Sequence, residues 1–366
     1  MAKILVSGYY GFNNTGDEAV LTGIIRSTRE LEPTTTFTVI SGTVAQTRVL
    51  HGVDAVSRGA FREIWRIMGE VDLVLQGGGS LVQDRTSLKS LLYYLSILTM
   101  AKLRRKPVMI FAQGIGPVVT NTGRSVVPLV LNRVNQITVR DPESKETLRR
   151  LGVHRPAVVT ADPALALGPS NPAEGLALLR QHGADPRPII GVSVRPWKHQ
   201  GQPMEPELAR ALDQMAREYG AQVVFLPMQY PHDVRAGAAV AGFMQERALV
   251  LEARFTPAQT MAMVAACNLF VGMRLHTLIF AALNGVPLVG LSYDPKNDSF
   301  LQRIGETAAG TTDHLNGDAV VEAARRVMAD VPSFRAHMAE YMATMIPLAR
   351  ENARLALSLL KRREQP

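Results

Sequence analysis

The sequence predicts an α/β protein of two doubly wound domains that face each other across a cleft. Short β-branched apolar segments alternate with longer stretches of helical periodicity in both halves of the chain. This alternation is typical of repeated βαβ units, and hence of a parallel sheet covered by helices on both faces. The chain has 366 residues, 46% of them hydrophobic, which exceeds the roughly 250–300 residues at which a single core stops growing.

Ten short segments have the composition of buried strands. They are residues 3–7, 37–41, 73–76, 108–113, 137–140 and 157–160 in the first half, and 189–194, 223–227, 269–272 and 288–292 in the second. Segments such as 19–30, 88–103 and 143–151 separate them and have helical periodicity. We therefore expect one parallel sheet in each half.

A proline-rich stretch separates the halves, with Pro169, Pro172, Pro186 and Pro188. Turn-forming residues at this density are typical of a linker between domains. We predict an N-terminal domain at 1–168, a linker region at 169–187, a C-terminal domain at 188–346 and a C-terminal helix at 347–366. This helix has Pro347 at its start, and it either crosses back to the N-terminal domain or caps the C-terminal one.

The net charge is +8, from 40 basic and 32 acidic residues, with basic clusters at 102–106 and 361–363. No basic stripe with interleaved aromatic residues occurs, so we expect no nucleic-acid partner. An anionic substrate and an anionic membrane surface explain the excess equally well. A peripheral contact of 102–106 with the inner membrane leaflet therefore stays open, as does the oligomeric state.

The chain is expected in the cytoplasm. Its first residues have a strand pattern and not that of a signal peptide. The longest apolar-rich run, 91–103, is shorter than the roughly 20 residues that span a bilayer. The single cysteine, Cys267, excludes a disulfide framework and a cysteine-based zinc site. Its apolar neighbours predict that it is buried.

The first predicted strand leads into a glycine- and asparagine-rich loop that opens a helix. This arrangement directs free backbone amides at an anion, although the spacing is neither the dinucleotide fingerprint nor a P-loop. Thr15 and Glu18 have the spacing of a helix N-cap and its capping box. A helix cap does not explain Asn13, Asn14 or Asp17. A sugar or a diphosphate suits these three residues better as a ligand than a nucleoside triphosphate does.

Two further predicted strands end in glycine-rich turns, Gly77-Gly78-Gly79 after Gln76 and Gly114-Ile-Gly116 after Gln113. Open α/β sheets bind ligands at the carboxyl ends of their strands. Three such turns in one sheet predict a crevice floor where backbone approaches a ligand closely.

Several cationic side chains follow predicted strands: Arg140, Arg195, Arg274 and Lys296. An arginine at a strand end forms bidentate pairs with carboxylate or phosphate, although Arg140 has a salt bridge to Asp141 or Asp162 as its alternative role. Near Arg274, His276 stands at a predicted helix start. We expect no metal, because no cluster of histidine and acidic residues has the spacing of metal ligands. We also expect no other cofactor.

These segments resemble the polysaccharide pyruvyl transferase family. The matching features, in the order of the family, are residues 8–19, 77–80, 113–117, 140–144, 274–276 and 291–296. The resemblance is closest to the bacterial members that pyruvylate N-acetylmannosamine in cell-wall polymers, where the ketal anchors surface-layer proteins. It implies a GT-B-like fold of two Rossmann-like domains, with phosphoenolpyruvate as donor and a lipid-linked or nucleotide-linked sugar as acceptor.

The resemblance also implies roles for the residues. By motif it places Arg274 and His276 at the donor, with a backbone contact from Leu275. Arg140, Arg195 and Lys296 are expected to bind the donor as well, because phosphoenolpyruvate carries a carboxylate and a phosphate. The expected acceptor-binding residues are Asn13, Asn14, Thr15, Gly16, Glu18, Gly78, Gly79 and Gln113. His276, Arg274 and Asp17 are the candidate catalytic residues, since ketal formation needs a proton for the methylene carbon of the donor and a carboxylate suits the developing cation.

Two other functions stay open from sequence. One is a glycosyltransferase of the same fold that uses a nucleotide sugar, which fold alone does not exclude. The other is a non-catalytic sensor of phosphosugars, which would bind ligand without turnover.

Overall fold

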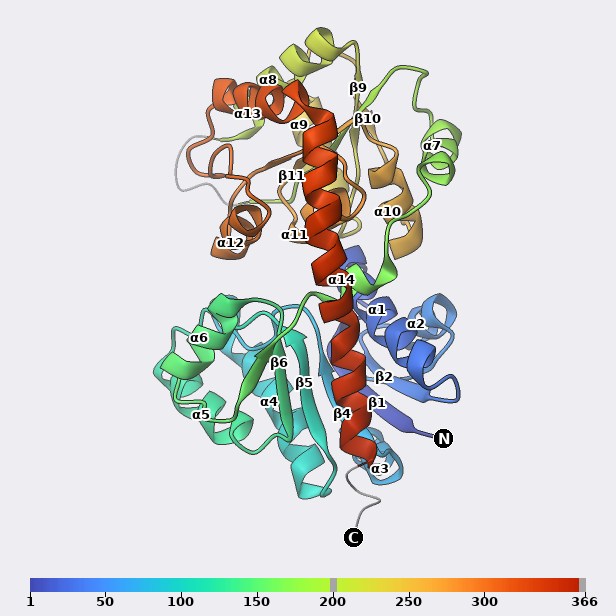
Figure 1. The fold of residues 1–366 in the computed structure, drawn as a ribbon, viewed down its shortest axis with the longest axis vertical. Coiled ribbons are helices and arrows are strands. Elements are labelled where there is room, and N and C mark those ends of the chain that lie inside the picture. The colour runs from blue at the N-terminus through green and yellow to red at the C-terminus, as the bar shows by residue number, and fades with distance from the viewer. Residues whose placement is uncertain (198–202, 362–366) are drawn as a thin grey trace. The chain divides into compact units, whose positions relative to one another are not determined.

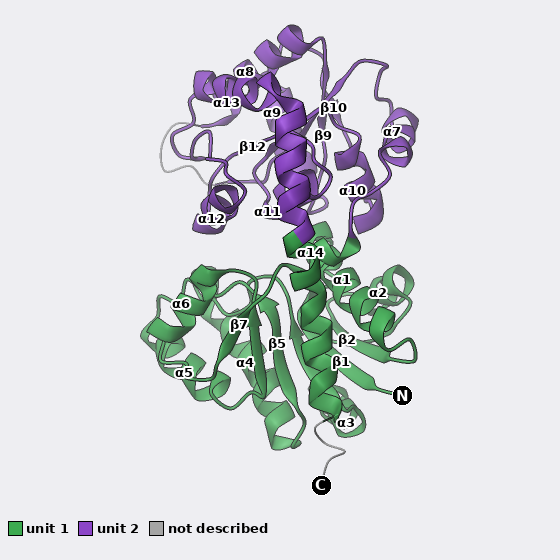
Figure 2. Cartoon of the chain, in the orientation of Figure 1, with its two compact units in different colours: residues 1–167, 344–366 green, residues 168–343 purple. Residues whose placement is uncertain are grey.

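The computed structural model describes residues 1–197 and 203–361 (Figure 1). The chain divides into two compact units, shown in Figure 2: Met1–Leu167 with Thr344–Pro366 form unit 1, and Gly168–Ala343 form unit 2. Among the described helices, none is both long and apolar enough to cross a membrane.

Unit 1 has a seven-stranded parallel sheet in the order β3-β2-β1-β4-β5-β6-β7. Its strands are β1 (Lys3–Tyr10), β2 (Thr36–Ser41), β3 (Asp54–Ser57), β4 (Leu73–Gly77), β5 (Val108–Gln113), β6 (Gln136–Val139) and β7 (Ala157–Val159). Its helices are α1 (Thr15–Leu31), α2 (Val44–His51), α3 (Phe61–Glu70), α4 (Leu88–Leu103), α5 (Asn121–Leu131), α6 (Pro142–Arg150) and the 3₁₀ helix η1 (Pro163–Leu167).

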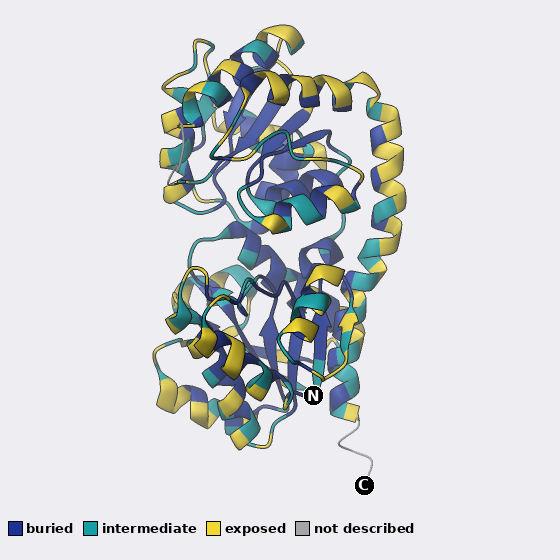
Figure 3. Ribbon diagram, turned by 90° about the vertical axis from the view of Figure 1, so that its left-hand side faces the viewer, coloured by how far each residue is buried: buried dark blue, intermediate teal, exposed yellow. Residues whose placement is uncertain are grey.

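The central strands of unit 1 are apolar on both faces because helices cover both. Leu5 and Val74 pack with Leu95 of α4 in one core cluster. Val6 points to the opposite face, as alternation along a strand requires, and lies with Ile24 of α1 around Gly77. The central strands β1, β4 and β5 are accordingly almost wholly buried, and many exposed residues lie on the outer faces of helices (Figure 3).

Unit 2 has a five-stranded parallel sheet in the order β10-β9-β8-β11-β12. Its strands are β8 (Ile189–Ser193), β9 (Gln222–Phe225), β10 (Leu249–Val250), β11 (Leu269–Gly272) and β12 (Leu288–Gly290). Its helices are α7 (Pro172–Gln181), α8 (Glu205–Tyr219), α9 (His232–Ala241), α10 (Pro257–Ala265), α11 (Leu275–Leu283), α12 (Pro295–Arg303) and α13 (Gly317–Ala329). The core joins Val192 and Val271 to Leu212 of α8 and Val320 of α13.

The predicted α/β class and the doubly wound topology are confirmed. Two short strands were not predicted, β3 and β10, because they span four and two residues at sheet edges and carry little pattern. Within the predicted linker region, α7 packs on unit 2: a Cβ at Gly175 would lie only 1.8 Å from the carbonyl oxygen of Ala262 in α10.

The predicted start of the last helix is wrong. Helix α14 (Val331–Lys361) begins sixteen residues before Pro347, which lies inside it, and the predicted end beyond Lys361 is outside the described residues. Proline lacks the N–H that would bond to the carbonyl four residues earlier, here that of Ala343, and the division between the units falls directly after that residue. In unit 1 the helix is held by Asn352, which accepts a hydrogen bond from Thr160 Oγ1 at 2.8 Å.

Candidate functional site

The strand order creates a topological switch point in each sheet. In unit 1, β1 lies beside β4, with Ser7 opposite Gln76, while β1 connects to β2 on one side and β4 to β5 on the other. In unit 2, β8 lies beside β11 in the same way, with Ser193 opposite Gly272. Ligands of open α/β sheets bind outside the carboxyl ends of the strands at such points. The predicted site residues follow these strands or their close neighbours.

The loop after β1 is capped differently from the prediction. The N-cap of α1 is Asn14, whose side-chain oxygen accepts the N–H of Gly16 at 3.2 Å. Asn13 precedes it with φ 59°, in the left-handed region that asparagine tolerates better than most residues. The predicted cap at Thr15 and its capping box are therefore wrong, because Asn14 supplies the capping oxygen and the Glu18 side chain is used elsewhere.

Glu18 ties this loop to a second helix. It is 3% exposed, its Oε1 accepts the N–H of Gly11 at 2.8 Å, and its Oε2 lies 2.8 Å from Nε2 of His51, the last residue of α2. His51 was missed from sequence, since it lies 33 positions from Glu18 and outside any motif.

The turn after β4 packs directly on the first turn of α1. Gly79 has φ 74°, and a Cβ there would lie 2.9 Å from Oδ1 of Asp17. A Cβ at Gly78 would lie 1.9 Å from Val20. The structure thus brings together Asp17 with Gly78 and Gly79, which the sequence placed in one crevice floor, and leaves no room for a side chain on either glycine.

Tyr10 is a further candidate at this edge that the sequence analysis did not single out. A Cβ at Gly77 would lie only 2.5 Å from the Tyr10 hydroxyl oxygen. Burial, followed by the charges of Asp17 and Glu18, raises the pKa of Tyr10 well above its ordinary value, so the hydroxyl stays a proton donor. Among the described residues, neither this hydroxyl nor Oε1 of the predicted residue Gln113 has a hydrogen-bond partner, and both are buried. The sequence signal that could have identified Tyr10 is the pair of tyrosines at the end of the buried strand β1.

Arg140 lies in unit 1 in the ionic arrangement that the sequence left as its alternative. It is 6% exposed, with Nη1 2.9 Å from Asp162 Oδ2 and Nε 3.6 Å from Asp141. Burial by itself would lower the pKa of Arg140, but the two carboxylates outweigh it and raise the pKa. The Arg140 guanidinium is thus charged, and the two carboxylates balance its charge. Its contact with the donor substrate stays a prediction.

In unit 2, Arg274 is held by an acidic residue that the sequence analysis missed. Arg274 is the N-cap residue of α11, and its Nε donates to Asp233 Oδ2 at 3.0 Å while Nη2 donates to Asp233 Oδ1. Asp233 is 3% exposed and also accepts the backbone N–H groups of Met228 and Gln229. Its carboxylate therefore fixes the plane of the Arg274 guanidinium. The pair joins the first turn of α9 to the N-cap of α11, 41 positions apart in the sequence.

Arg195 lies at the same edge and is held by aromatic rings. Its guanidinium carbon is 4.8 Å from the ring centre of Tyr293 and 5.9 Å from that of Trp197. The two rings meet edge to face at 5.5 Å, and Trp197 Nε1 donates to Asp313 at 3.0 Å. Among the described residues, the buried Nε of Arg195 has no hydrogen-bond partner. Stacking on the guanidinium face leaves the N–H groups in its plane for an anion.

The remaining predicted donor residues begin two helices. Leu275 and His276 are the first residues of α11 and are half-buried, and the His276 ring lies 6.4 Å from that of Phe280. Lys296 is in the first turn of α12, where its N–H donates to the N-cap residue Asp294 at 3.0 Å. Because β8, β11 and β12 are neighbours in the sheet, these cations follow adjacent strands.

The two edges therefore differ in chemistry. The edge of unit 2 carries Arg195, Arg274 and Lys296, with Asp233 bound to Arg274, and this group of cations suits an anionic ligand. The edge of unit 1 carries closely approaching backbone, a protonated hydroxyl and Asp17, which suits a ligand with hydroxyl groups. Within residues 1–197 and 203–361, no three histidine, cysteine, aspartate or glutamate side chains are grouped so as to hold a metal ion.

The sequence model of the polysaccharide pyruvyl transferase family matches residues 14–295, a range that begins at the N-cap of α1 and includes β4 and the switch point of unit 2. The chain belongs to this family. The amylovoran biosynthesis protein AmsJ of Erwinia amylovora is 26% identical over 273 residues, which are 69% of this chain and 65% of that protein. The match thus spans just under two thirds of this relative.

Solved structures share the fold. The S. aureus MnaA–UDP co-structure has a TM-score of 0.64 at 14% identity, with 96% of this chain and 94% of that chain covered. Anabaena Alr3699/HepE in complex with UDP-glucose has a TM-score of 0.60 at 14% identity, with 99% and 98% covered. At these identities the likeness shows the fold alone, which is a GT-B-like fold of two Rossmann-like units.

Proposed function

We propose that the chain transfers a pyruvyl group from phosphoenolpyruvate to a sugar of a polysaccharide precursor, forming a cyclic ketal and releasing phosphate. The family match over residues 14–295 carries this proposal. It includes the start of α1 with Asp17 and the Arg274–His276 segment, and it ends one residue before Lys296.

The charges of unit 2 support phosphoenolpyruvate as donor. This molecule carries a carboxylate and a phosphate, and Arg195, Arg274 and Lys296 follow adjacent strands of the sheet. Arg274 shares its charge with Asp233, so it serves as an oriented donor of hydrogen bonds. Arg195 has no carboxylate partner among the described residues, so its charge attracts an anion without that offset.

The edge of unit 1 supports a sugar as acceptor. Gly78 and Gly79 let the turn after β4 pack against the first turns of α1, and Tyr10, Asp17 and Gln113 at this edge are polar groups suited to hydroxyls. We propose N-acetylmannosamine in a lipid-linked cell-wall precursor as the acceptor, with surface-layer anchoring as the role of the product. An enzyme with such an acceptor works in the cytoplasm, at the inner face of the membrane.

The reaction then follows from these residues. A proton reaches the methylene carbon of the donor, and His276 is the group suited to deliver it. One sugar hydroxyl attacks the cationic carbon and loses its proton, while Asp17 stabilises or accepts positive charge. The bond from this carbon to the phosphate oxygen breaks, and a second hydroxyl closes the ring. The two hydroxyl protons balance the one added to carbon and the one carried away by phosphate.

The test incubates the purified protein with phosphoenolpyruvate and a lipid-linked disaccharide that ends in N-acetylmannosamine. We expect phosphate release that depends on both substrates and a product with the mass of a pyruvyl ketal. A matched disaccharide without this sugar tests the acceptor. Turnover of a uridine diphosphate sugar in place of phosphoenolpyruvate would show a glycosyltransferase, and binding of phosphoenolpyruvate without any turnover would show a sensor.

A further inference from the structure

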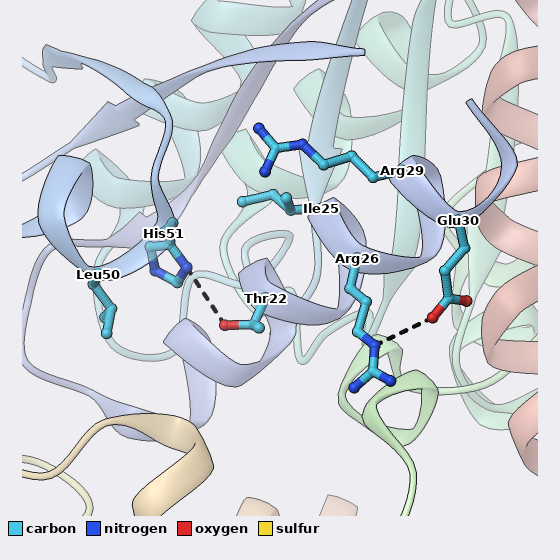
Figure 4. A pocket seen from close by; sticks show the side chains of 7 residues that line it. All are labelled: Thr22, Ile25, Arg26, Arg29, Glu30, Leu50 and His51. Carbon is cyan, nitrogen blue, oxygen red and sulfur yellow. Dashed lines mark hydrogen bonds and ion pairs between the residues drawn. The ribbon is translucent and has the colours of Figure 1, made fainter. Parts of the chain in front are cut away.

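His51 lies outside all the segments that the family resemblance singled out, yet it is nearly enclosed. Its side chain is 1% exposed, and it forms part of the wall of a pocket of about 450 Å³ between α1 and α2. Figure 4 shows the ring beside Leu50, pointing towards Thr22 of α1. Arg26 and Glu30, which pair with each other at 3.1 Å, line the far end of this pocket.

The ring is joined to the loop after β1 through one carboxylate. His51 Nε2 lies 2.8 Å from Glu18 Oε2, and Glu18 Oε1 accepts the N–H of Gly11 at 2.8 Å. The Glu18 side chain is 4% exposed. A buried carboxylate needs partners for both oxygens, and these two contacts supply them.

The hydrogen bonds also define how the ring is held. Thr22 Oγ1 donates to the carbonyl of Glu18 at 2.8 Å and lies 3.4 Å from His51 Nδ1. Each ring nitrogen therefore has a polar neighbour, Thr22 at Nδ1 and Glu18 at Nε2. Both ring nitrogens are used, which fixes the ring and with it the Glu18 carboxylate.

The turn at Gly11 packs closely against the end of β2 and the residues that follow it. Gly11 has φ 76°, and a Cβ there would lie 2.2 Å from Ser41 Oγ and 2.5 Å from the backbone nitrogen of Thr43. Its N–H is the group that Glu18 binds. Asn13 and the N-cap Asn14 follow within three residues, so the position of the turn sets the start of α1, including Asp17.

We propose that His51 is a positioning residue of the candidate site: it fixes Glu18, and through Glu18 the turn at Gly11 that carries Asn13, Asn14 and Asp17. The expected effect on activity rests on the proposed function. His51 itself touches no substrate.

The first experiment measures the loop directly, so that it does not depend on the proposed function. Hydrogen exchange of peptides covering residues 8–20 is compared in the wild type, His51→Leu, His51→Gln and Thr22→Val, with melting temperatures for each. We expect faster exchange in His51→Leu, which offers Glu18 no donor, and near-wild-type exchange in His51→Gln, whose amide replaces the Nε2 donor. Thr22→Val removes only the weaker contact and should change exchange little.

The control is His182→Leu, because His182 is exposed in unit 2 and meets Phe255 edge to face. It should leave the exchange of residues 8–20 unchanged. If His51→Leu folds and protects these residues as the wild type does, the positioning role is refuted, whatever reaction the protein catalyses. If His51→Leu does not fold, the comparison of His51→Gln with His51→Ala decides, and equal exchange in the two refutes the role.

Steady-state kinetics then measures the consequence. His51→Leu should lower kcat/KM for the acceptor at least about tenfold, since misplacement by about 1 Å can cost about a hundredfold, and should leave the KM for phosphoenolpyruvate within about twofold. Imidazole added to His51→Ala can enter through the adjoining pocket and should restore part of the rate. Altered loop exchange with no turnover even in the wild type would refute the proposed function and keep the positioning role. If His51→Leu lowers kcat/KM equally for donor and acceptor, and imidazole does not restore the rate of His51→Ala, the role of His51 in catalysis is refuted.

Discussion

Arg274 and Asp233 form a two-pronged ion pair at the carboxyl edge of the sheet of unit 2, with Nε and Nη2 of the arginine on the two carboxylate oxygens. Asp233 is held in turn by the backbone N–H groups of Met228 and Gln229 at 3.1 and 2.9 Å. The guanidinium is therefore oriented before any ligand binds, and only part of it remains to meet a ligand. The pair explains why an arginine, with its planar set of donors, stands at this position.

Arg274→Lys should raise the KM for phosphoenolpyruvate at least about tenfold, because an ammonium is a point charge and cannot satisfy Asp233 and a ligand anion in one plane. Initial rates at varied phosphoenolpyruvate, with a melting curve for each variant, measure the effect. Arg217→Lys is the matched control, since Arg217 pairs with Glu246 on the surface of unit 2. A donor KM equal to that of the wild type would remove Arg274 from the donor site.

Asp84→Asn should destabilise the fold in a pH-dependent way. Asp84 is 5% exposed and accepts the N–H groups of Val119 and Thr120 at 2.6 and 3.1 Å, together with the Thr120 hydroxyl. Burial raises the pKa of Asp84, but these hydrogen bonds outweigh it and the pKa lies below its ordinary value. A carboxylate with a lowered folded-state pKa stabilises the fold above its unfolded pKa of about 3.9, and this stability is lost as the pH falls through the folded value.

Denaturant unfolding at several pH values measures this effect. Near pH 7 we expect Asp84→Asn to cost about 1–3 kcal/mol, the range for buried groups that lose a partner, and the difference from the wild type should shrink below about pH 4 as the wild-type carboxylate is protonated. Asp54→Asn, an exposed change at the start of β3, is the control. If the difference in unfolding free energy between Asp84→Asn and the wild type is the same at pH 7 and pH 3, the stabilising role of the Asp84 carboxylate is contradicted.

The sequence predicted the sheet core well because buried parallel strands are continuous apolar segments. The limits of β5 and β11 agree with the prediction, and the ends of β1 and β4 differ by one to three residues. The start of α14 was missed because a proline usually begins a helix, whereas Pro347 lies within one.

The sequence predicted the site residues that directly follow a strand. It did not predict those that lie on another element, far away in the sequence, and contact the site residues only in the fold. Asp17 and Gly79 lie together because two neighbouring strands end at one edge. Asp233 and His51 lie 41 and 33 positions from Arg274 and Glu18, the residues that they hold, and no spacing rule connects such pairs. The cap at Asn14 was missed because Thr15 and Glu18 have the same spacing as a real capping box.

Asp17→Asn should reduce turnover at least about tenfold, since a positioned acid or base contributes about a hundredfold or more, with a melting temperature near that of the wild type. Asp17 lies against Gly79 at the start of α1, so the amide fits the same space without its charge. Phosphate release under saturating donor and acceptor measures the effect, and Asp185→Asn on the surface of unit 2 serves as the control. Unchanged turnover would leave the loop as a simple connection between β1 and α1.

His276→Gln gives the most direct test of the chemistry. His276 is the second residue of α11, half-buried, beside the N-cap residue Arg274 and following the strand that neighbours β8. Glutamine keeps a polar side chain of similar length but cannot donate and recover a proton near neutral pH. We therefore expect the variant to fold and to bind phosphoenolpyruvate, and to lose at least about a hundredfold in turnover, the lower end for general acid–base catalysis.

Two measurements separate binding from proton transfer in this variant. Calorimetry with phosphoenolpyruvate gives the donor affinity, and single-turnover phosphate release gives the rate of the chemical step. His182→Gln, an exposed histidine at the end of α7, controls for the substitution itself. If donor binding is lost while the fold survives, His276 binds the donor and the proton comes from another group. If the rate is unchanged, His276 has no part in the reaction.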